Sequence, residues 1–185
     1  MSELEFKGFG KIPRLNRDIV ITEKIDGTNG AIVIGEGGEF QAQSRKRIIT
    51  PEDDNHGFAN WAYANRDALI ETLGEGYHYG EWWGSGINRK YGLKGEDKRF
   101  SLFNTYRWSN VDLSAIPQLG VVPILYNGMF IEYEIKDVLD ALKFFGSMAA
   151  PGFMEPEGIV IFHEHANQLF KVTLENDEKP KGSTE

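Results

Sequence analysis

Apolar and polar positions alternate over several short stretches of the chain, and this pattern predicts β-strands. Two strands are expected over residues 18–25 and 30–34, on either side of the turn segment DGTNG, and a third over residues 39–44. Asp-Gly with a nearby Asn-Gly between apolar runs is typical of a β-hairpin. Residues 77–83 are strand-like as well. The chain is therefore expected to be rich in strands.

Two segments have helical spacing instead. Between residues 55 and 73 apolar residues recur every three or four positions until the segment GEG, and residues 135–145 carry a second apolar stripe. Further strands are predicted for RFSLFNTYRW (residues 99–108) and for residues 120–126, where a proline indicates an edge or a bulge. EGIVIFHE and QLFKVTLE are expected to form a closing pair of strands.

This order of elements indicates the fold class. The strands do not alternate strictly with helices, which argues against a doubly wound parallel sheet. The pattern predicts an α+β fold of mainly antiparallel β-sheets with inserted helices. A single domain is expected over residues 1–175. Residues 176–185, NDEKPKGSTE, are polar and contain Pro and Gly, so we expect them to form a flexible tail.

The composition of the chain limits the classes of protein to which it can belong. With 185 residues, of which 41% are apolar, the chain can bury one core. No segment is long and apolar enough to span a membrane, the N-terminus lacks a secretory signal, and there is no cysteine. A cytoplasmic protein without membrane contact is expected. The net charge of −8 argues against a general nucleic-acid binder, yet basic residues cluster at SRKR (residues 44–47) and over residues 89–107.

Lys24 is the first candidate for chemistry, because it stands in an apolar strand directly before the turn of Asp26 and Gly27. A lysine in such a strand is costly unless it is paired or used. To attack a phosphate, its amine must lose its proton, which partial burial and neighbouring cations favour. A nucleotide site also needs an aromatic face, carboxylates and further cations. Candidates for these parts are Arg45, Glu81, Phe103, Glu157 and Lys171.

Several segments together resemble the motifs of the covalent nucleotidyltransferase superfamily, which contains DNA ligases, RNA ligases and mRNA capping enzymes. EKIDGTN is similar to the motif with the acceptor lysine, and SRKR to the segment that follows it. YGEWWG, RFSLFNTY, PEGIVIF and LFKVT resemble the later motifs, in the family's order, over residues 21–173. TEKIDGTN is most similar to the nick-sealing phage type of RNA ligase. The resemblance implies an ATP-grasp-like nucleotidyltransferase (adenylation) domain.

The resemblance also implies a role for each matching residue. Lys24 is expected to attack the α-phosphate of ATP, so that pyrophosphate leaves and a lysyl–AMP phosphoramidate forms. Phe103 is expected to stack on the adenine, with Glu23 near its amino group. The other residues expected to bind ATP, Mg²⁺ (or Mn²⁺) or the nucleic acid are Ile25, Asp26 and Gly27 in the turn, Asn29 at a nucleic-acid end, Arg45 at the ribose and the 5′-phosphate, Glu81 at the ribose or the metal, Glu157 at the metal, and Lys171 at the α-phosphate.

The implied substrate is a nucleic acid, RNA by this resemblance, with 5′-phosphate and 3′-hydroxyl ends, which a monomeric enzyme joins. AMP passes from Lys24 to the 5′-phosphate and leaves when the strands are joined. The chain departs from the family in one motif, which usually has two lysines separated by one residue. Here Leu169 stands at that spacing before Lys171 and Thr173 stands at it after Lys171, so either alignment lacks one lysine. No OB-fold or helical C-terminal domain is recognised, so a partner protein is a candidate for gripping the substrate.

Two alternatives remain open from the sequence. The first is another enzyme of the superfamily, either a DNA nick ligase or a capping-type nucleotidyltransferase that uses GTP. The second is a module that binds nucleotides or nucleic-acid ends without turnover, which the missing lysine and the acidic charge favour. Formation of a lysyl–AMP adduct on Lys24 separates the enzymes from the binding module.

Overall fold

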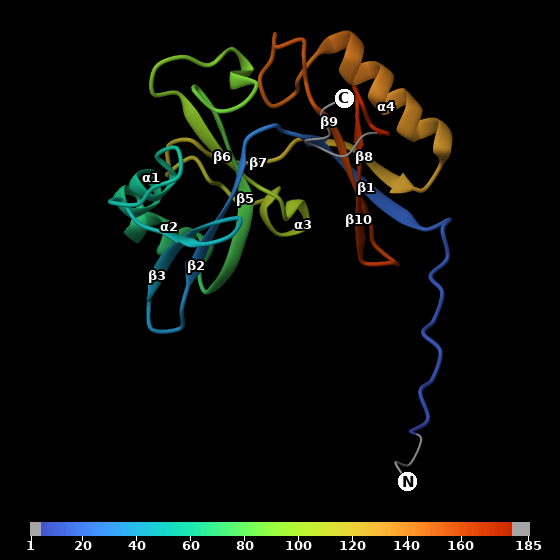
Figure 1. The fold of residues 1–185 in the computed structure, drawn as a ribbon, viewed down its shortest axis with the longest axis horizontal. Helices are drawn as coiled ribbons and strands as arrows, with labels where there is room; N and C mark the ends of the chain where they lie inside the picture. Colours follow the sequence, from blue (N-terminus) through green and yellow to red (C-terminus); the bar gives the residue numbers. More distant parts are fainter. Residues whose placement is uncertain (1–4, 179–185) are drawn as a thin grey trace.

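The computed structural model describes residues 5–178 and contains two β-sheets that stand side by side (Figure 1). The four-stranded sheet is antiparallel throughout and has the strand order β10-β9-β1-β8. Its strands are β1 (Asp18–Lys24), β8 (Ile124–Met129), β9 (Gly158–His163) and β10 (Gln168–Thr173). The chain leaves this sheet directly after β1 and enters the other one, so residues 25–27 connect the two.

The six-stranded sheet has the order β4-β3-β2-β5-β6-β7. All its neighbouring strands are antiparallel except β6 and β7, which are parallel. Its strands are β2 (Thr28–Ile34), β3 (Phe40–Ser44), β4 (Ile48–Ile49), β5 (Gly76–Gly84), β6 (Lys98–Leu102) and β7 (Leu119–Val121). Strand β5 is central in it and pairs with β2 and β6.

The longer helices cover the sheets on their outer sides (Figure 1). Helices α1 (Phe58–Ala64) and α2 (Arg66–Leu73) bury an aromatic-rich core against the six-stranded sheet, which includes Phe58, Trp82 and Phe100. Helix α4 (Glu132–Phe145) covers the four-stranded sheet over a separate aliphatic core. Two short elements complete the fold, the 3-10 turn η1 (Lys90–Gly92) and helix α3 (Thr105–Trp108).

A third, smaller core lies at the junction of the sheets. Ile25 packs there with Trp83, Tyr91, Val122 and Ala150, all at most 5% exposed. Because these residues come from the connection after β1, from β5, from η1 and from two later loops, this core holds the two sheets together where the chain crosses between them.

The predicted fold class is confirmed, since the structure is an α+β arrangement of mainly antiparallel sheets. The prediction of one helix over residues 55–73 is wrong in one detail. The helix is broken at Asn65, whose backbone leaves helical geometry and whose side chain donates to the Trp61 carbonyl. Asparagine often competes in this way with the helical hydrogen bonds.

Two strand predictions also need correction. The strand predicted over residues 99–108 ends at Leu102, because the Asn104 side chain accepts from the Arg107 N–H and caps helix α3. The strand predicted over residues 120–126 is two strands of different sheets, β7 and β8, with Pro123 between them. Proline lacks an N–H for the ladder, and the Pro123 carbonyl accepts from Glu23 instead.

The described part of the chain ends within the predicted tail. Of the predicted tail, residues 179–185 lie outside the described residues. Within residues 5–178, the longest helix is α4 with 14 residues, and no helix is long and apolar enough to cross a membrane.

Candidate functional site

Lys24 is the last residue of β1 and stands where the chain leaves the four-stranded sheet. Side chains alternate between the two faces of a strand, and the buried side chains of β1 are those of Ile19, Ile21 and Glu23. Lys24 therefore lies on the opposite face from Glu23. Its side chain is 20% exposed, so its amine is accessible without being freely solvated.

Glu157 is the partner of Lys24. The Lys24 amine donates to Glu157 Oε2 at 2.5 Å, and the glutamate side chain is only 6% exposed. The contact follows from the strand register, because Glu157 precedes Gly158, which pairs with Lys24 across β1 and β9. Two residues that the sequence analysis assigned to one site are thus in direct contact.

Strand β10 extends the same face. Gly158 pairs with Lys24 on one side and with Thr173 on the other. Because directly paired residues share a face, Thr173 and Lys171 both lie on the face of Lys24. Lys171 is exposed. The Thr173 hydroxyl donates to the Glu175 carbonyl at 2.9 Å, and the Thr173 N–H donates to Asp177 Oδ1 at 2.8 Å. At Thr173, where a lysine would complete the family motif on this side of Lys171, the side chain is therefore a hydroxyl bound to the local backbone.

Glu81 fixes the turn after Lys24. Its two carboxylate oxygens accept from the Gly27 N–H at 3.0 Å and from the Asn29 side-chain amide at 3.1 Å. Burial raises the pKa of Glu81 to about 7, against the opposing effects of the Gly27 hydrogen bond and the charge of Lys24; the Glu157 charge adds to the rise. Glu81 is thus within the electrostatic reach of both partners of the Lys24–Glu157 pair.

The other side of the turn is held by residues that the sequence analysis did not assign. The Tyr91 hydroxyl accepts from the Asp26 N–H at 2.8 Å, and the Asn88 amide donates to Asp26 Oδ1 at 2.9 Å. Arg89 Nε lies 3.3 Å from Asp26 Oδ2. In the sequence, the signal for these contacts is the basic cluster that begins at Arg89. That cluster indicates positive charge and does not indicate a contact with the turn.

Glu23 is directed away from Lys24. Its carboxylate accepts from the Ser147 hydroxyl at 2.6 Å and from the N–H groups of Met148 and Ala149 at 2.8 and 2.9 Å. Burial raises the pKa of Glu23, and these three hydrogen bonds partly oppose that rise. Both oxygens are engaged within the protein, so the expected contact with the adenine amino group stays a prediction. Ile25, also predicted to bind the cofactor, has its side chain in the junction core.

Phe103 and Arg45 lie on the six-stranded sheet. Phe103 directly follows β6, is 42% exposed, and its N–H donates to the Tyr79 carbonyl. Arg45 directly follows β3 and is exposed. Since Asn29 pairs with Glu81 and Gly30 with Ser44, Arg45 belongs to the end of the sheet nearest the turn. Among the predicted residues, Lys24 contacts Glu157, and Glu81 contacts Gly27 and Asn29.

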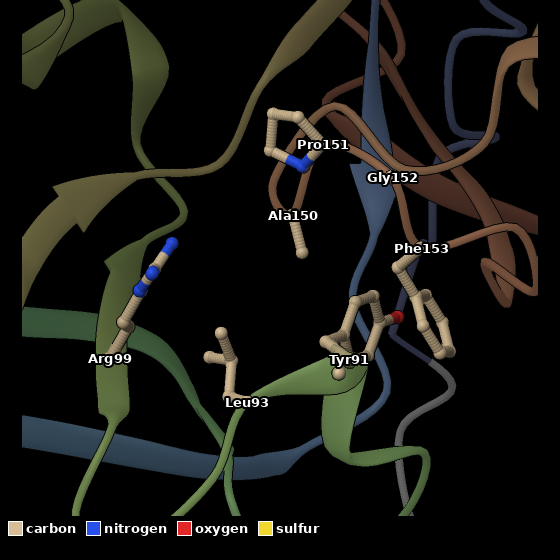
Figure 2. A pocket seen from close by; sticks show the side chains of 8 residues that line it. Tyr91, Leu93, Arg99, Ala150, Pro151, Gly152 and Phe153 are labelled. Carbon is tan, nitrogen blue, oxygen red and sulfur yellow. The ribbon is translucent and has the colours of Figure 1, made fainter.

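A pocket of about 370 Å³ lies beside the junction (Figure 2). Figure 2 shows Arg99 on one side, Tyr91 and Phe153 on the other, and Leu93 between them, with the loop of Ala150 above. Tyr91 and Ala150 belong to the junction core with Ile25, and neither Lys24 nor Glu157 lines this pocket. It is thus separate from the Lys24–Glu157 pair.

The carboxylates suit a hard divalent cation. Within residues 5–178, no group of three or more His, Cys, Asp or Glu side chains is placed to hold a metal by itself. Magnesium commonly binds through one or two carboxylates together with substrate phosphates. Glu157, with Glu81 nearby, fits that pattern, and the missing ligands would then come from a nucleotide.

The fold is that of the nucleotidyltransferase domain of RNA ligases, as comparison with solved structures shows. An apo mutant of Naegleria gruberi RNA ligase superposes with a TM-score of 0.62 at 20% identity, covering 86% of this chain and 50% of that one. A mutant of the same enzyme with AMP and Mn gives 0.64 at 18% identity with the same coverage, and the enzyme with PPi gives 0.62 at 18%, covering 85% and 50%. The chain spans about half the length of these structures.

A comparison of the sequence with protein-family models identifies the family. The model of the RNA ligase family matches residues 17–173, and the chain belongs to this family. No curated protein sequence matches the chain closely enough to count as a relative. The matched range begins one residue before β1 and ends with β10, so it contains Lys24, Glu81, Glu157 and Lys171.

Proposed function

We propose that this chain is the adenylation domain of an ATP-dependent RNA ligase that joins 5′-phosphate and 3′-hydroxyl ends. The observation that carries the proposal is the direct contact of Lys24 with Glu157 at the junction of the two sheets, beside a turn that Glu81 fixes. A partly buried lysine can act as a nucleophile once a neighbouring cation favours loss of its proton. The carboxylates beside Lys24 are suited to hold such a divalent cation. Membership of the RNA ligase family supports the same reading.

The proposed reaction has three steps. The Lys24 amine attacks the α-phosphorus of ATP, a P–N bond forms, and the P–O bond to pyrophosphate breaks. The 5′-phosphate of the RNA then attacks the same phosphorus and releases Lys24. Finally, the 3′-hydroxyl attacks the 5′-phosphorus, which forms the phosphodiester and expels AMP. Before the first step Lys24 must separate from Glu157 and lose its proton, because an ammonium has no electron pair for the attack.

Mg²⁺ or Mn²⁺ supplies charge neutralisation of the phosphates when bound, and Glu157 and Glu81 are the proposed ligands. Phe103 stacks on the adenine, while Lys171, on the face of Lys24, contacts the α-phosphate. Arg45 and Asn29 bind the RNA ends. Two of the similar solved structures, of a protein described as an RNA ligase, hold AMP with Mn or PPi, which supports ATP and a divalent cation here.

The domain organisation and setting belong to the same proposal. Residues 1–175 form one nucleotidyltransferase domain, which acts as a monomer in the cytoplasm. A partner protein that supplies part of the grip on the substrate belongs to the same proposal.

Mass spectrometry after incubation with ATP and Mg²⁺ tests the proposal. We expect a gain of one AMP, located on Lys24, and its discharge onto 5′-phosphorylated RNA. Lys24→Ala is expected to abolish the adduct, whereas Lys143→Ala, which removes an exposed lysine of α4, is expected to retain it. An adduct formed from GTP points to a capping-type enzyme, and discharge onto nicked DNA alone points to a DNA ligase.

A non-catalytic module that binds nucleotides or nucleic-acid ends is the second candidate. It is favoured by Thr173, whose hydroxyl donates to the Glu175 carbonyl and supplies no positive charge where a family lysine is expected. Absence of any adduct with ATP or GTP, together with retained binding of the nucleotide, would select this candidate.

A further inference from the structure

The face of the six-stranded sheet turned away from α1 and α2 carries a group of exposed aromatic side chains. Tyr77 and Tyr79 of β5 are 59% and 56% exposed, and Phe103 is 42% exposed. Their neighbours on β5, His78 and Gly80, face the aromatic core on the other side. Large aromatic side chains that gather on one exposed face usually mark a binding surface.

The arrangement of the rings is regular. The centroids of Tyr77 and Tyr79 lie 6.1 Å apart, with an angle of only 18° between the ring planes. Phe103, directly after β6, stands beside Tyr79, because its N–H donates to the Tyr79 carbonyl across the sheet. Near-parallel rings can receive the flat bases of one strand in a single orientation.

The cross-strand neighbours of the two tyrosines on β2 and β3 are uncharged. Their partners on β2 are Val33 and Ala31, and the next partners on β3 are Gln41 and Gln43. Gln43 donates to Gln41 at 2.6 Å, so a pair of amides borders the rings. Amides and aromatic rings suit nucleobases, which stack and form hydrogen bonds on their edges; they do not suit a charged peptide.

The aromatic face is continuous with the candidate site. Tyr79 stands two residues before Glu81 on the same face of β5, and Tyr77 stands two residues before Tyr79 on that face. At about 3.3 Å per residue, the row extends about 13 Å from Glu81 along the sheet. Arg45, the proposed contact of the 5′-phosphate, belongs to the end of the sheet at Glu81. A strand with its 5′-phosphate at Arg45 can therefore continue over the tyrosines.

We propose that Tyr77 and Tyr79 form a stacking platform for unpaired bases of the RNA next to its 5′-phosphate. This inference rests on the proposed RNA substrate and adds the part of the protein that holds it. It also accounts for how an acidic chain binds RNA, since stacking on aromatic rings needs no positive charge and contributes to affinity base by base. The platform is expected to tolerate any base sequence, because every base has a flat face.

Fluorescence anisotropy with a short, single-stranded, 5′-phosphorylated RNA, without ATP, tests the platform. Stacking energies of this kind predict that Tyr77→Ala/Tyr79→Ala weakens binding about tenfold or more. Tyr77→Phe/Tyr79→Phe keeps the rings and is expected to bind as the unmodified protein does. Tyr133→Ala removes an equally exposed tyrosine from α4 and serves as the control. Circular dichroism checks the fold of each variant.

A second measurement changes the RNA instead of the protein. An RNA that lacks the bases of its second to fourth nucleotides is expected to bind the unmodified protein as weakly as the complete RNA binds Tyr77→Ala/Tyr79→Ala. Equal affinity for the two RNAs, unchanged affinity in the double variant, or no RNA binding at all overturns the platform. So does a protein dimer, seen by sedimentation, that the double variant dissociates.

The outcome is separable from that of the proposed function. Adduct formation on Lys24 is measured on the unmodified protein without RNA. If the adduct forms but the tyrosines do not affect RNA binding, the platform alone fails. If RNA binding depends on the tyrosines and no adduct forms, the ligase proposal fails and the platform stands.

Discussion

The carboxylate of Glu157 lies 2.5 Å from the side-chain nitrogen of Lys24, although 133 residues separate them in the chain. In this contact the lysine is a hydrogen-bond donor, and it cannot attack a phosphate until the contact breaks. Glu157 thus has two proposed tasks, to hold the amine in place at rest and to bind the metal with ATP. The two tasks predict opposite effects of its removal.

Glu157→Ala is expected to reduce the rate of Lys24–AMP formation about a hundredfold, because losing one preorganised electrostatic group commonly costs that much. Quantitative mass spectrometry over time measures the rate. Glu155→Ala, which removes a neighbouring exposed carboxylate, is the control and is expected to be unaffected. A faster rate in Glu157→Ala would show that this residue only restrains the lysine.

Glu81 is expected to act through the geometry of the turn. Glu81→Ala leaves the Gly27 N–H and the Asn29 amide without their acceptor, which is expected to lower the free energy of unfolding by about 1–3 kcal/mol. Glu81→Gln still accepts from Gly27, but its amide meets the amide of Asn29. The double variant Asn29→Asp/Glu81→Gln restores one donor and one acceptor.

Chemical denaturation measures these differences. The double variant is expected to be more stable than Glu81→Gln alone, since it restores the hydrogen bond between positions 29 and 81. If the single and the double variant unfold at the same denaturant concentration, the hydrogen bond between Asn29 and Glu81 does not stabilise the turn.

Glu23 is expected to affect stability more than chemistry, because it anchors the loop of Ser147, Met148 and Ala149. Glu23→Ala removes the acceptor of three hydrogen bonds and is expected to cost about 3 kcal/mol. Glu23→Gln keeps an acceptor for the backbone N–H groups and is expected to cost much less. Thermal unfolding of both variants compares them.

The effect of pH on the stability that depends on Glu23 has a definite sign. Burial raises the pKa of Glu23 in the folded state above its ordinary value of 4.5, so the folded state binds the proton more tightly than the unfolded state. The stability from this proton is fully present below pH 4.5 and is lost as the pH rises through the folded pKa. Relative to the unmodified protein, Glu23→Gln is therefore expected to become more stable as the pH rises from 4 to 7. A constant difference over that range would contradict the raised pKa.

Much of this site could be predicted from the sequence, because the informative residues are local. The turn after Lys24 is set by Asp-Gly and Asn-Gly, and the alternation around Glu81 and Lys171 places these residues on strands. The family motifs then supplied which of these strands lie together. The contact between Lys24 and Glu157 follows once β1 and β9 are paired with Lys24 opposite Gly158.

Other features depend on packing that no local pattern records. The direction of Glu23 follows from strand alternation, but the three donors of the loop that it binds lie more than 120 residues away. Asn88 and Arg89 bind the turn from a long loop without a regular pattern. The break at Asn65 and the split at Pro123 are likewise decided by side-chain hydrogen bonds and by the sheet that each segment joins.

Thr173→Lys tests what the missing lysine does. Position 173 shares the face of Lys24 across Gly158, so a lysine there would add a cation on the side of the proposed triphosphate. We expect Lys24–AMP formation at low ATP concentration to become several-fold faster, up to about tenfold, because a new charge contact of this size lowers a barrier by that amount. Gln168→Lys adds the same charge at the other end of β10 and is the control. Equal acceleration by both variants would mean that only the net charge matters, and no acceleration by Thr173→Lys would mean that Lys171 alone suffices on this strand.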